Sequence, residues 1–197
     1  MLTRVLLPLA VVLGVAACGG EKTWSEQHEI DRVAYRAPGP ATLTLVTVVG
    51  SRTGAGGHTG LLINGTQRVV WDPAGTWWHP DAPERNDMLF GMTPGMVDTY
   101  IDYHTRSTYH TVLQEITVTP QVAQMAMQLA ANNGPAAKAQ CGLTTSKILS
   151  QLPGFETIAV GYYPTKIMAD FAKLPGVTTR KVYDDDPADN SDKLQDR

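Results

Sequence analysis

A β-hairpin signal between His58 and Asp72 constrains the fold of this chain more than any other stretch. Before it, TLTLVTVV at 42–49 is apolar and β-branched on both faces, which predicts a buried strand. After a glycine-rich loop at 51–57, HTGLLI and QRVVWD flank an Asn-Gly pair, the strongest short-range hairpin signal. A buried strand followed by a β-hairpin is therefore expected. The loop lacks the Gly-Lys-Ser/Thr ending of a phosphate-binding loop.

Helices are expected beyond this hairpin, so the predicted fold class is α+β with a central antiparallel sheet. Residues 109–118 alternate like a strand, and Thr119-Pro120 supplies an N-cap and a first-turn proline for a helix to about residue 132. A helix at 164–173 and a last strand at 177–183 follow, and there is room for a short helix between 24 and 35. The irregular segment 73–108 is expected to shape a substrate cleft.

Cys141 opens a further predicted helix, within QCGLTTSKIL, which Pro153-Gly154 ends. Residues 144–147 leave a polar face, and an apolar stripe runs along the other: Leu143, Ile148, Leu149 and Leu152. The free N–H groups and the dipole at a helix N-terminus lower a cysteine pKa, which favours the nucleophilic thiolate. The alternative is a buried, inert cysteine, the commonest fate of a free thiol.

The first eighteen residues resemble the start of a bacterial lipoprotein. Arg4 precedes an apolar run to Val15, as in a secretory signal, and Val-Ala-Ala-Cys18 resembles a lipobox. The resemblance implies a signal peptide at 1–17, an anchor and spacer at 18–41, and attachment to the membrane of the cell envelope through lipidated Cys18. Because Gly19 is not aspartate, it also implies the outer membrane, facing the periplasm. Cys141 would then be unpaired in an oxidising compartment, which favours catalysis.

Charge and composition exclude some partners. With 16 basic and 19 acidic side chains the formal charge is −3, so no surface for nucleic acid is expected. Six aspartates follow from residue 184 onward, which predicts a disordered acidic tail at 184–197. Residues 42–183 are expected to form one domain, and no cofactor is expected.

His58 and Asp72 are the candidate partners of Cys141, because a thiolate catalyst needs a nearby base and a group that orients it. With a three-residue turn at 64–66, Asp72 lies opposite His58 on one face of the sheet; a two-residue turn would shift it. The alternative for His58 is a solvated histidine at a strand edge. The alternative for Asp72 is a residue that only helps to form the turn after the strand. No metal site is expected, since the histidines at 28, 58, 79, 104 and 110 lack a zinc-ligand spacing.

The HTGLLI hairpin, followed about eighty residues later by a helix that begins at cysteine, resembles the circularly permuted branch of the NlpC-type papain-like superfamily, which includes lecithin-retinol acyltransferase-like proteins. The resemblance covers roughly residues 42–176. It implies a papain-like fold with Cys141 as nucleophile, His58 as base and Asp72 as the orienting residue, and with the Cys141 N–H in an oxyanion hole. The separation of His58 and Asp72 is longer than in common NlpC-type hairpins.

The function implied is a lipid-anchored cysteine hydrolase that cleaves an amide bond, such as one in a cell-wall peptide, through a thioester acyl-enzyme. An acyltransferase or lipid esterase of the same fold is the first alternative. A non-catalytic envelope-binding lipoprotein is the second, with an unreactive Cys141 and a cleft closed by Trp77 and Trp78. The reactivity of the thiol separates this last alternative from the enzymes.

Overall fold

The computed structural model describes residues 20 and 22–194. The predicted signal peptide and Cys18 lie outside these residues. The strands are β1 (Thr42–Gly50), β2 (Gly56–Asn64), β3 (Arg68–Trp71), β4 (Glu84–Arg85), β5 (Met88–Leu89), β6 (Tyr109–Thr117) and β7 (Thr178–Val182). The helices are α1 (Gln27–Val33), α2 (Pro94–His104), α3 (Pro120–Asn133), α4 (Cys141–Leu149) and α5 (Pro164–Phe171), with the 3-10 helix η1 (Ser191–Lys193).

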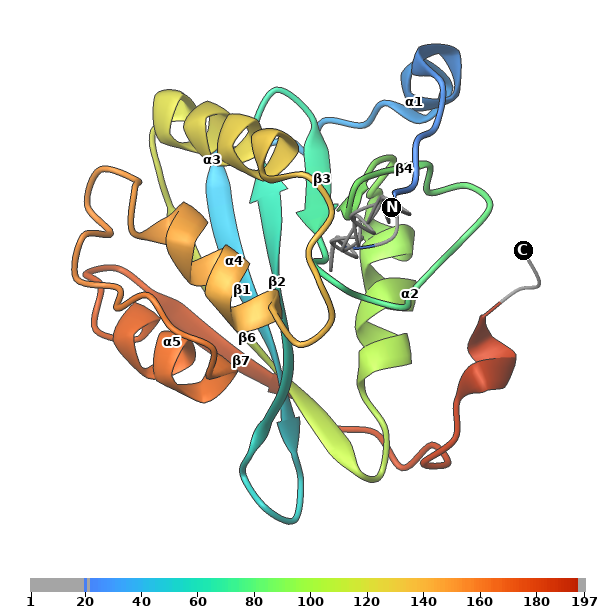
Figure 1. Ribbon diagram of the computed structural model, residues 1–197, viewed down its shortest axis with the longest axis vertical. Coiled ribbons are helices and arrows are strands. Elements are labelled where there is room, and N and C mark those ends of the chain that lie inside the picture. The colour runs from blue at the N-terminus through green and yellow to red at the C-terminus, as the bar shows by residue number, and fades with distance from the viewer. Residues whose placement is uncertain (1–19, 21, 195–197) are drawn as a thin grey trace, which may run out of the picture.

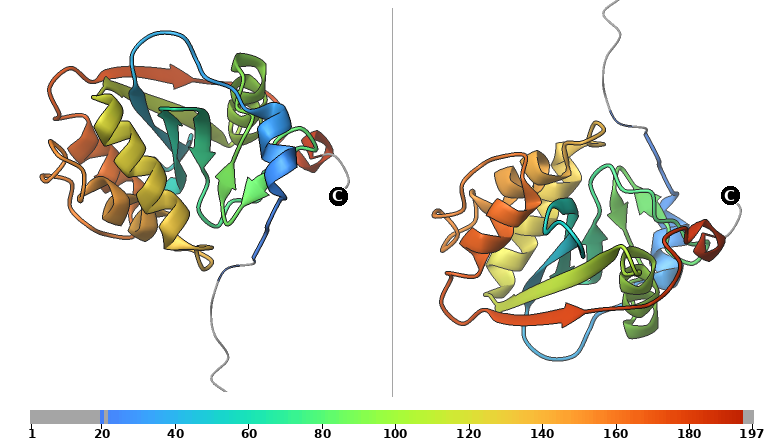
Figure 2. Two further views of the ribbon diagram at one scale, coloured as in Figure 1. Left: turned by 90° about the horizontal axis from the view of Figure 1, so that it is seen from above. Right: turned by 90° about the horizontal axis from the view of Figure 1, so that it is seen from below.

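The fold is α+β, built on one seven-stranded antiparallel sheet in the order β4-β5-β3-β2-β1-β6-β7. Strand β1 is the buried strand that its apolar sequence predicts, and it pairs with β2 on one side and β6 on the other. Helices α3, α4 and α5 cover one face of the sheet and α2 covers the opposite face (Figures 1 and 2). Each face therefore has its own core.

The hairpin of β2 and β3 forms as predicted, but its register differs. Leu61 pairs with Trp71, and Asn64 pairs with Arg68, so the loop is 65–67 and begins one residue later than predicted. Asn64 stays in the strand because its side-chain amide donates to the carbonyl of Pro40 at 3.1 Å. Continuing this register places Asp72 level with residue 60 and two residues from the predicted position. A shift of two residues keeps the same face.

The segment 73–108 contains two short strands and helix α2, none of which the sequence reading placed. Thr93 caps α2 by accepting a hydrogen bond from the Met96 N–H, and Pro94 occupies the first turn. The helix packs its buried residues Tyr100, Ile101 and His104 onto the sheet. The segment is therefore a structural layer of the domain as well as a border of the candidate site.

Both ends of the described chain pack on the domain. In the predicted spacer, α1 forms and Ile30 is buried in the core of the α3–α5 face. In the predicted tail, Lys193 pairs with Asp102 on α2 and with Asp186, contacts that the composition does not predict. No helix within residues 20 and 22–194 is both long and apolar enough to span a membrane.

Candidate active site

The candidate site lies where β2 runs past the end of β3. The pairing of these strands ends at Leu61 and Trp71, so among the described strands residues 56–60 of β2 pair only with β1. Helix α4 begins at this free edge, and the N–H of Thr59 donates a hydrogen bond to the sulfur of Cys141. The sulfur of Cys141 therefore lies between the start of α4 and the edge of β2. Cys141 is 9% exposed.

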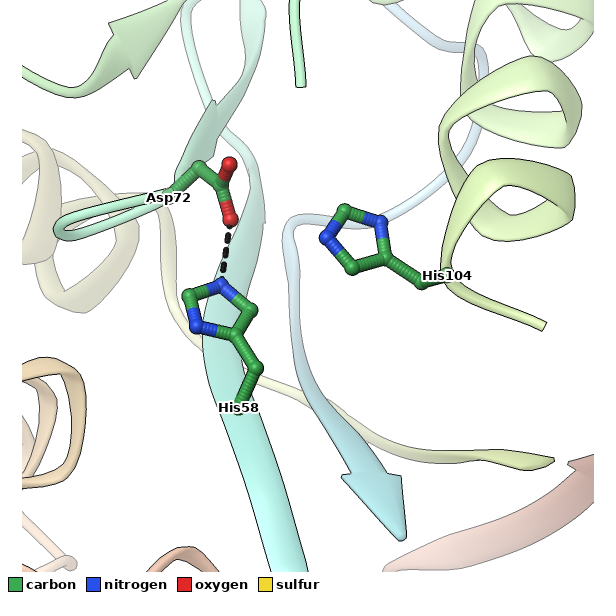
Figure 3. Close-up of side chains that lie close together, drawn as sticks. All are labelled: His58, Asp72 and His104. Carbon is green, nitrogen blue, oxygen red and sulfur yellow. Dashed lines mark hydrogen bonds and ion pairs between the residues drawn. The ribbon is translucent and has the colours of Figure 1, made fainter. Parts of the chain in front are cut away.

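His58 and Asp72 form a buried contact beside this sulfur. The Nε2 atom of His58 lies 2.7 Å from Oδ1 of Asp72, the first residue after β3 (Figure 3). The hydroxyl of Tyr100, from α2, donates to the same Oδ1 at 2.6 Å. Gly60 makes this approach possible, because a Cβ there would lie 3.0 Å from the Tyr100 hydroxyl and 2.9 Å from the Trp71 carbonyl oxygen. The predicted partnership of His58 and Asp72 is therefore present, although the two are diagonal neighbours.

The charges of the three groups support one another. Burial alone would lower the pKa of His58, but the Asp72 carboxylate and the Cys141 sulfur outweigh it and raise the pKa well above its usual value. Burial would raise the pKa of Asp72, and His58 together with the Tyr100 hydroxyl lowers it instead. For Cys141, the hydrogen bonds from His58 and from the Thr59 N–H overcome burial and lower the thiol pKa. An imidazolium–thiolate pair is thereby favoured.

The two nitrogens of His58 have separate partners. Nε2 is engaged by Asp72, which leaves Nδ1 as the nitrogen that hydrogen-bonds the sulfur of Cys141. In Figure 3 this second nitrogen points away from Asp72. A carboxylate on one nitrogen fixes the ring orientation and the tautomer for proton transfer at the other. Sulfur, imidazole and carboxylate therefore form a continuous chain.

His104 is a further member of this cluster that the sequence reading did not select. Its Nδ1 lies 2.8 Å from the carbonyl oxygen of Tyr100, so Nδ1 carries the proton, and its ring stacks on His58 with centroids 5.5 Å apart. Burial, with the nearby charges of His58 and Arg106, lowers the pKa of His104 to about 4. His104 is therefore neutral at pH 7, and its Nε2 faces the contact between His58 and Asp72 (Figure 3).

These three side chains include the donor atoms of a metal site. His58, Asp72 and His104 each offer one ligand atom, and the three atoms lie within 4.8 Å of one another. Two nitrogens and a carboxylate suit Zn²⁺. However, the His58 Nε2 proton is held by Asp72 at 2.7 Å, and the positive charge of Arg106 acts on His104. The direct ion pair accounts for this geometry better than a metal does, and we assign the cluster no metal role.

Helix α4 is more deeply buried than its sequence predicts. The polar face at 144–147 is mostly covered: Thr144, Thr145 and Ser146 are buried, and Lys147 alone of the four is exposed. The physical reason is the segment 159–163, which covers the start of the helix: Ser146 donates to the Gly161 carbonyl at 3.2 Å. A Cβ at Gly142 would lie 2.5 Å from the Tyr162 carbonyl oxygen, so this approach needs glycine.

One buried carboxylate ties together the two loops that border the site. Asp87 Oδ2 accepts hydrogen bonds from the N–H of Ala74, in the turn after Asp72, and from the N–H of Ala136, in the loop before Cys141. Burial, opposed by these two bonds, raises the pKa of Asp87 to about 6. Both loops also contain an alanine in the left-handed region: φ is 56° at Ala74 and 62° at Ala139. Such strain is common at functional sites.

The other histidines and tryptophans singled out by the sequence lie elsewhere. His28 is exposed on α1, His79 stacks on Trp77, and His110 stacks on Tyr183. Trp77 is 3% exposed and packs edge-on against Tyr100, so it belongs to the core of the α2 face.

Comparisons with protein-family models, with curated proteins and with solved structures gave no match.

Proposed function

We propose that this protein is a cysteine hydrolase that cleaves an amide bond through a thioester intermediate. The observation that carries the proposal is the chain of contacts from the Cys141 sulfur through His58 to Asp72. A structural cysteine does not require a base held by a carboxylate, whereas a nucleophilic thiol does. The lowered pKa of Cys141 and its position at a helix N-terminus support the same role.

Each residue has a defined step in the proposed reaction. The thiolate of Cys141 attacks the amide carbonyl carbon, and the charge that develops on oxygen is stabilised by the Cys141 N–H at the start of α4. The His58 imidazolium donates its Nδ1 proton to the leaving amine, and the C–N bond breaks. His58 then accepts a proton from water, which attacks the thioester; the C–S bond breaks, the carboxylic acid leaves, and the Cys141 thiolate and the His58 imidazolium are restored. Asp72 holds the ring throughout.

We also propose a permuted NlpC-type papain-like fold and a lipid anchor at Cys18. The order His58, Asp72, Cys141 along the chain, with the cysteine helix beginning at the edge of the histidine strand, supports this assignment of the fold. The lipobox-like sequence before Cys18 supports attachment to the cell envelope. A cell-wall peptide is then the substrate proposed. An acyltransferase would use the same thioester, with an alcohol or amine in place of water.

The test is the pH dependence of iodoacetamide labelling of Cys141, followed on its own peptide by mass spectrometry. A thiolate paired with imidazolium labels rapidly near pH 6, far below the unperturbed cysteine pKa of about 8.5. In His58→Ala the labelling profile should move up toward that value. His28→Ala is the matched control, because His28 is solvent-exposed on α1; its profile should equal that of the parent chain.

Two results would contradict the proposal. Labelling that begins only when the protein unfolds would make Cys141 a structural residue and favour the non-catalytic binding lipoprotein. A low apparent pKa that persists in His58→Ala would show that His58 is not the base. Where labelling behaves as expected, hydroxylamine trapping would then detect the thioester acyl-enzyme that the hydrolase and the acyltransferase share.

A further inference from the structure

A cavity next to His58 contains the cationic side chain of Arg106 in its wall, and no acidic side chain among the described residues lines it. It has a volume of about 200 Å³ and opens between the end of α2, the start of β2 and the turn after Asp72. His58, His104 and Arg106 line it, together with uncharged residues of the neighbouring strands and loops: Val48, Gly57, Ala74, Gly75, Thr76, Tyr103 and Tyr109. A group bound in this cavity therefore lies beside the proposed base.

Arg106 is held in place without a counter-charge. Its guanidinium lies 4.7 Å from the ring centre of Tyr109, and its Nη1 donates to the Tyr103 carbonyl at 3.3 Å. Its Nε is buried without a hydrogen-bond partner. Among the residues that the structure describes, no carboxylate pairs with it. A half-buried guanidinium that lies against a tyrosine ring and has no carboxylate partner among the described residues is suited to bind an anion.

We infer that this cavity binds a carboxylate of the substrate, with Arg106 as its partner. The inference rests on the proposed function, since it places the carboxylate relative to the bond that Cys141 attacks. The cavity adjoins His58 and its small volume admits about one amino-acid residue, so we place the carboxylate in a residue next to the scissile amide, although Cys141 is not among the described residues that line the cavity. The substrate class is thus a peptide with either a free C-terminal carboxylate or an acidic side chain at that residue.

The charge of Arg106 already acts on this site, because it contributes to the low pKa of His104. A ligand carboxylate bound to Arg106 would neutralise that charge. A guanidinium and a carboxylate form two parallel hydrogen bonds, so a carboxamide of the same shape is a much poorer partner. Selectivity between these two isosteres is therefore the property that Arg106 should control.

The experiment compares matched thiol-directed probes on the full chain. N-iodoacetylglycine and N-iodoacetylglycinamide differ only in a terminal carboxylate, and N-iodoacetyl-glutamate α-amide and its glutamine counterpart differ only in a side-chain carboxylate. The carboxylate form of one pair should label Cys141 about tenfold faster, relative to the same ratio for glutathione. Arg106→Met should abolish that preference. The pair that responds identifies the source of the carboxylate.

Two variants control for charge and folding. Arg52→Met removes an exposed arginine from the neighbouring loop, and it should keep the preference. Arg106→Lys keeps the positive charge but lacks the planar guanidinium, so this variant should keep only part of the preference for the carboxylate probe. The neutral probes report whether each variant still presents a reactive thiol.

The possible results separate the inference from the proposed function. Rapid labelling that depends on His58, with a carboxylate preference unchanged by Arg106→Met or absent from the start, overturns the inference and leaves the hydrolase proposal standing. No labelling by any probe before unfolding overturns both. A preference that is lost equally in Arg52→Met would show general electrostatic attraction and would also overturn the role of Arg106.

Discussion

The two faces of the sheet use the same strands for different purposes. On the face under α3, α4 and α5, most core side chains of β1 and β2 are apolar and almost fully buried, as at Leu43, Leu45 and Leu61. On the opposite face the apolar contacts stop at Val46 and Val70, and buried polar groups take over toward the edge of β2: His58, Asp72, Tyr100 and His104.

This difference shows how a small domain can hold buried charges. Polar groups taken out of water destabilise a fold unless they are paired, and the α2 face pairs Asp72 with both His58 and Tyr100. The core of the α3–α5 face is mainly apolar, so the burial of its side chains stabilises the fold. The two faces should therefore respond differently to substitution, in stability on one side and in thiol reactivity on the other.

The largest effect is expected from Phe171→Ala on the α3–α5 face. Phe171 is fully buried in α5 and contacts the ring of Phe155 at 5.8 Å between centroids. The substitution should lower the free energy of unfolding by about 3–5 kcal/mol in urea denaturation, because it leaves a cavity. Below the melting temperature, the pH profile of Cys141 labelling should not move. A shifted profile would mean that the faces are not separable.

Tyr100→Phe probes the α2 face with a smaller loss of stability. Removing the hydroxyl takes one hydrogen bond from the Asp72 carboxylate and should cost about 1.5–3 kcal/mol. It should also raise the pKa of Asp72, weaken its hold on His58 and slow Cys141 labelling near pH 6. Tyr103→Phe is the matched control on the same helix, since its hydroxyl bonds only the exposed Thr76. If both variants label like the parent, Tyr100 has no part in the site.

The sequence could predict the α3–α5 face because its signals are local. Continuous apolar character identified β1, the Asn-Gly pair located the hairpin, and Thr119-Pro120 marked the start of α3. The pairing of His58 with Asp72 was also accessible, because it depends only on which face each residue occupies. The exact register was not accessible, since the side chain of Asn64 holds that residue in the strand through the distant Pro40 carbonyl.

The α2 face was missed although part of its signal is present. Thr93-Pro94 is the same capping pair as Thr119-Pro120, and Val97, Tyr100, Ile101 and His104 follow at helical spacing. Surrounding prolines and glycines obscured it. The roles of Tyr100, His104 and Arg106 could not be read at all, because they arise from packing between segments far apart in the chain.

Asp87→Asn tests how the carboxylate that bonds the loops at Ala74 and Ala136 makes the free energy of unfolding depend on pH. The pKa of Asp87 is about 6 in the folded protein, above the 3.8 of an ordinary aspartate, so the folded state binds the proton more tightly. The contribution of protonated Asp87 to the free energy of unfolding is therefore fully present below about pH 4, and it is lost as the pH rises through 6. Asparagine cannot ionise and can still accept the bonds from Ala74 and Ala136. It should stabilise the protein by roughly 1–3 kcal/mol at pH 7.5 and not at pH 4.

The matched control for Asp87→Asn is Asp81→Asn, because the Asp81 side chain is well exposed and makes only a long surface ion pair, to Arg32. Its unfolding free energy should change by less than about 0.5 kcal/mol at either pH. Equal stability of Asp87→Asn and the parent at both pH values would contradict the raised pKa. Faster or slower labelling of Cys141 in Asp87→Asn would show that the Asp87 carboxylate also helps to position the thiol.

The smallest effect is expected at Ala139, two residues before Cys141. Its φ of 62° lies in the left-handed region, which costs a residue with a Cβ about 1 kcal/mol or more. Glycine removes that strain but gives the unfolded chain more freedom, so Ala139→Gly should raise the unfolding free energy by only about 0.5 kcal/mol. Ala131→Gly, at an exposed position in α3, should instead lower it by about 1 kcal/mol. Opposite signs for the same substitution would locate the strain in the loop that precedes the thiol. Equal losses would mean that the loop tolerates its conformation without cost.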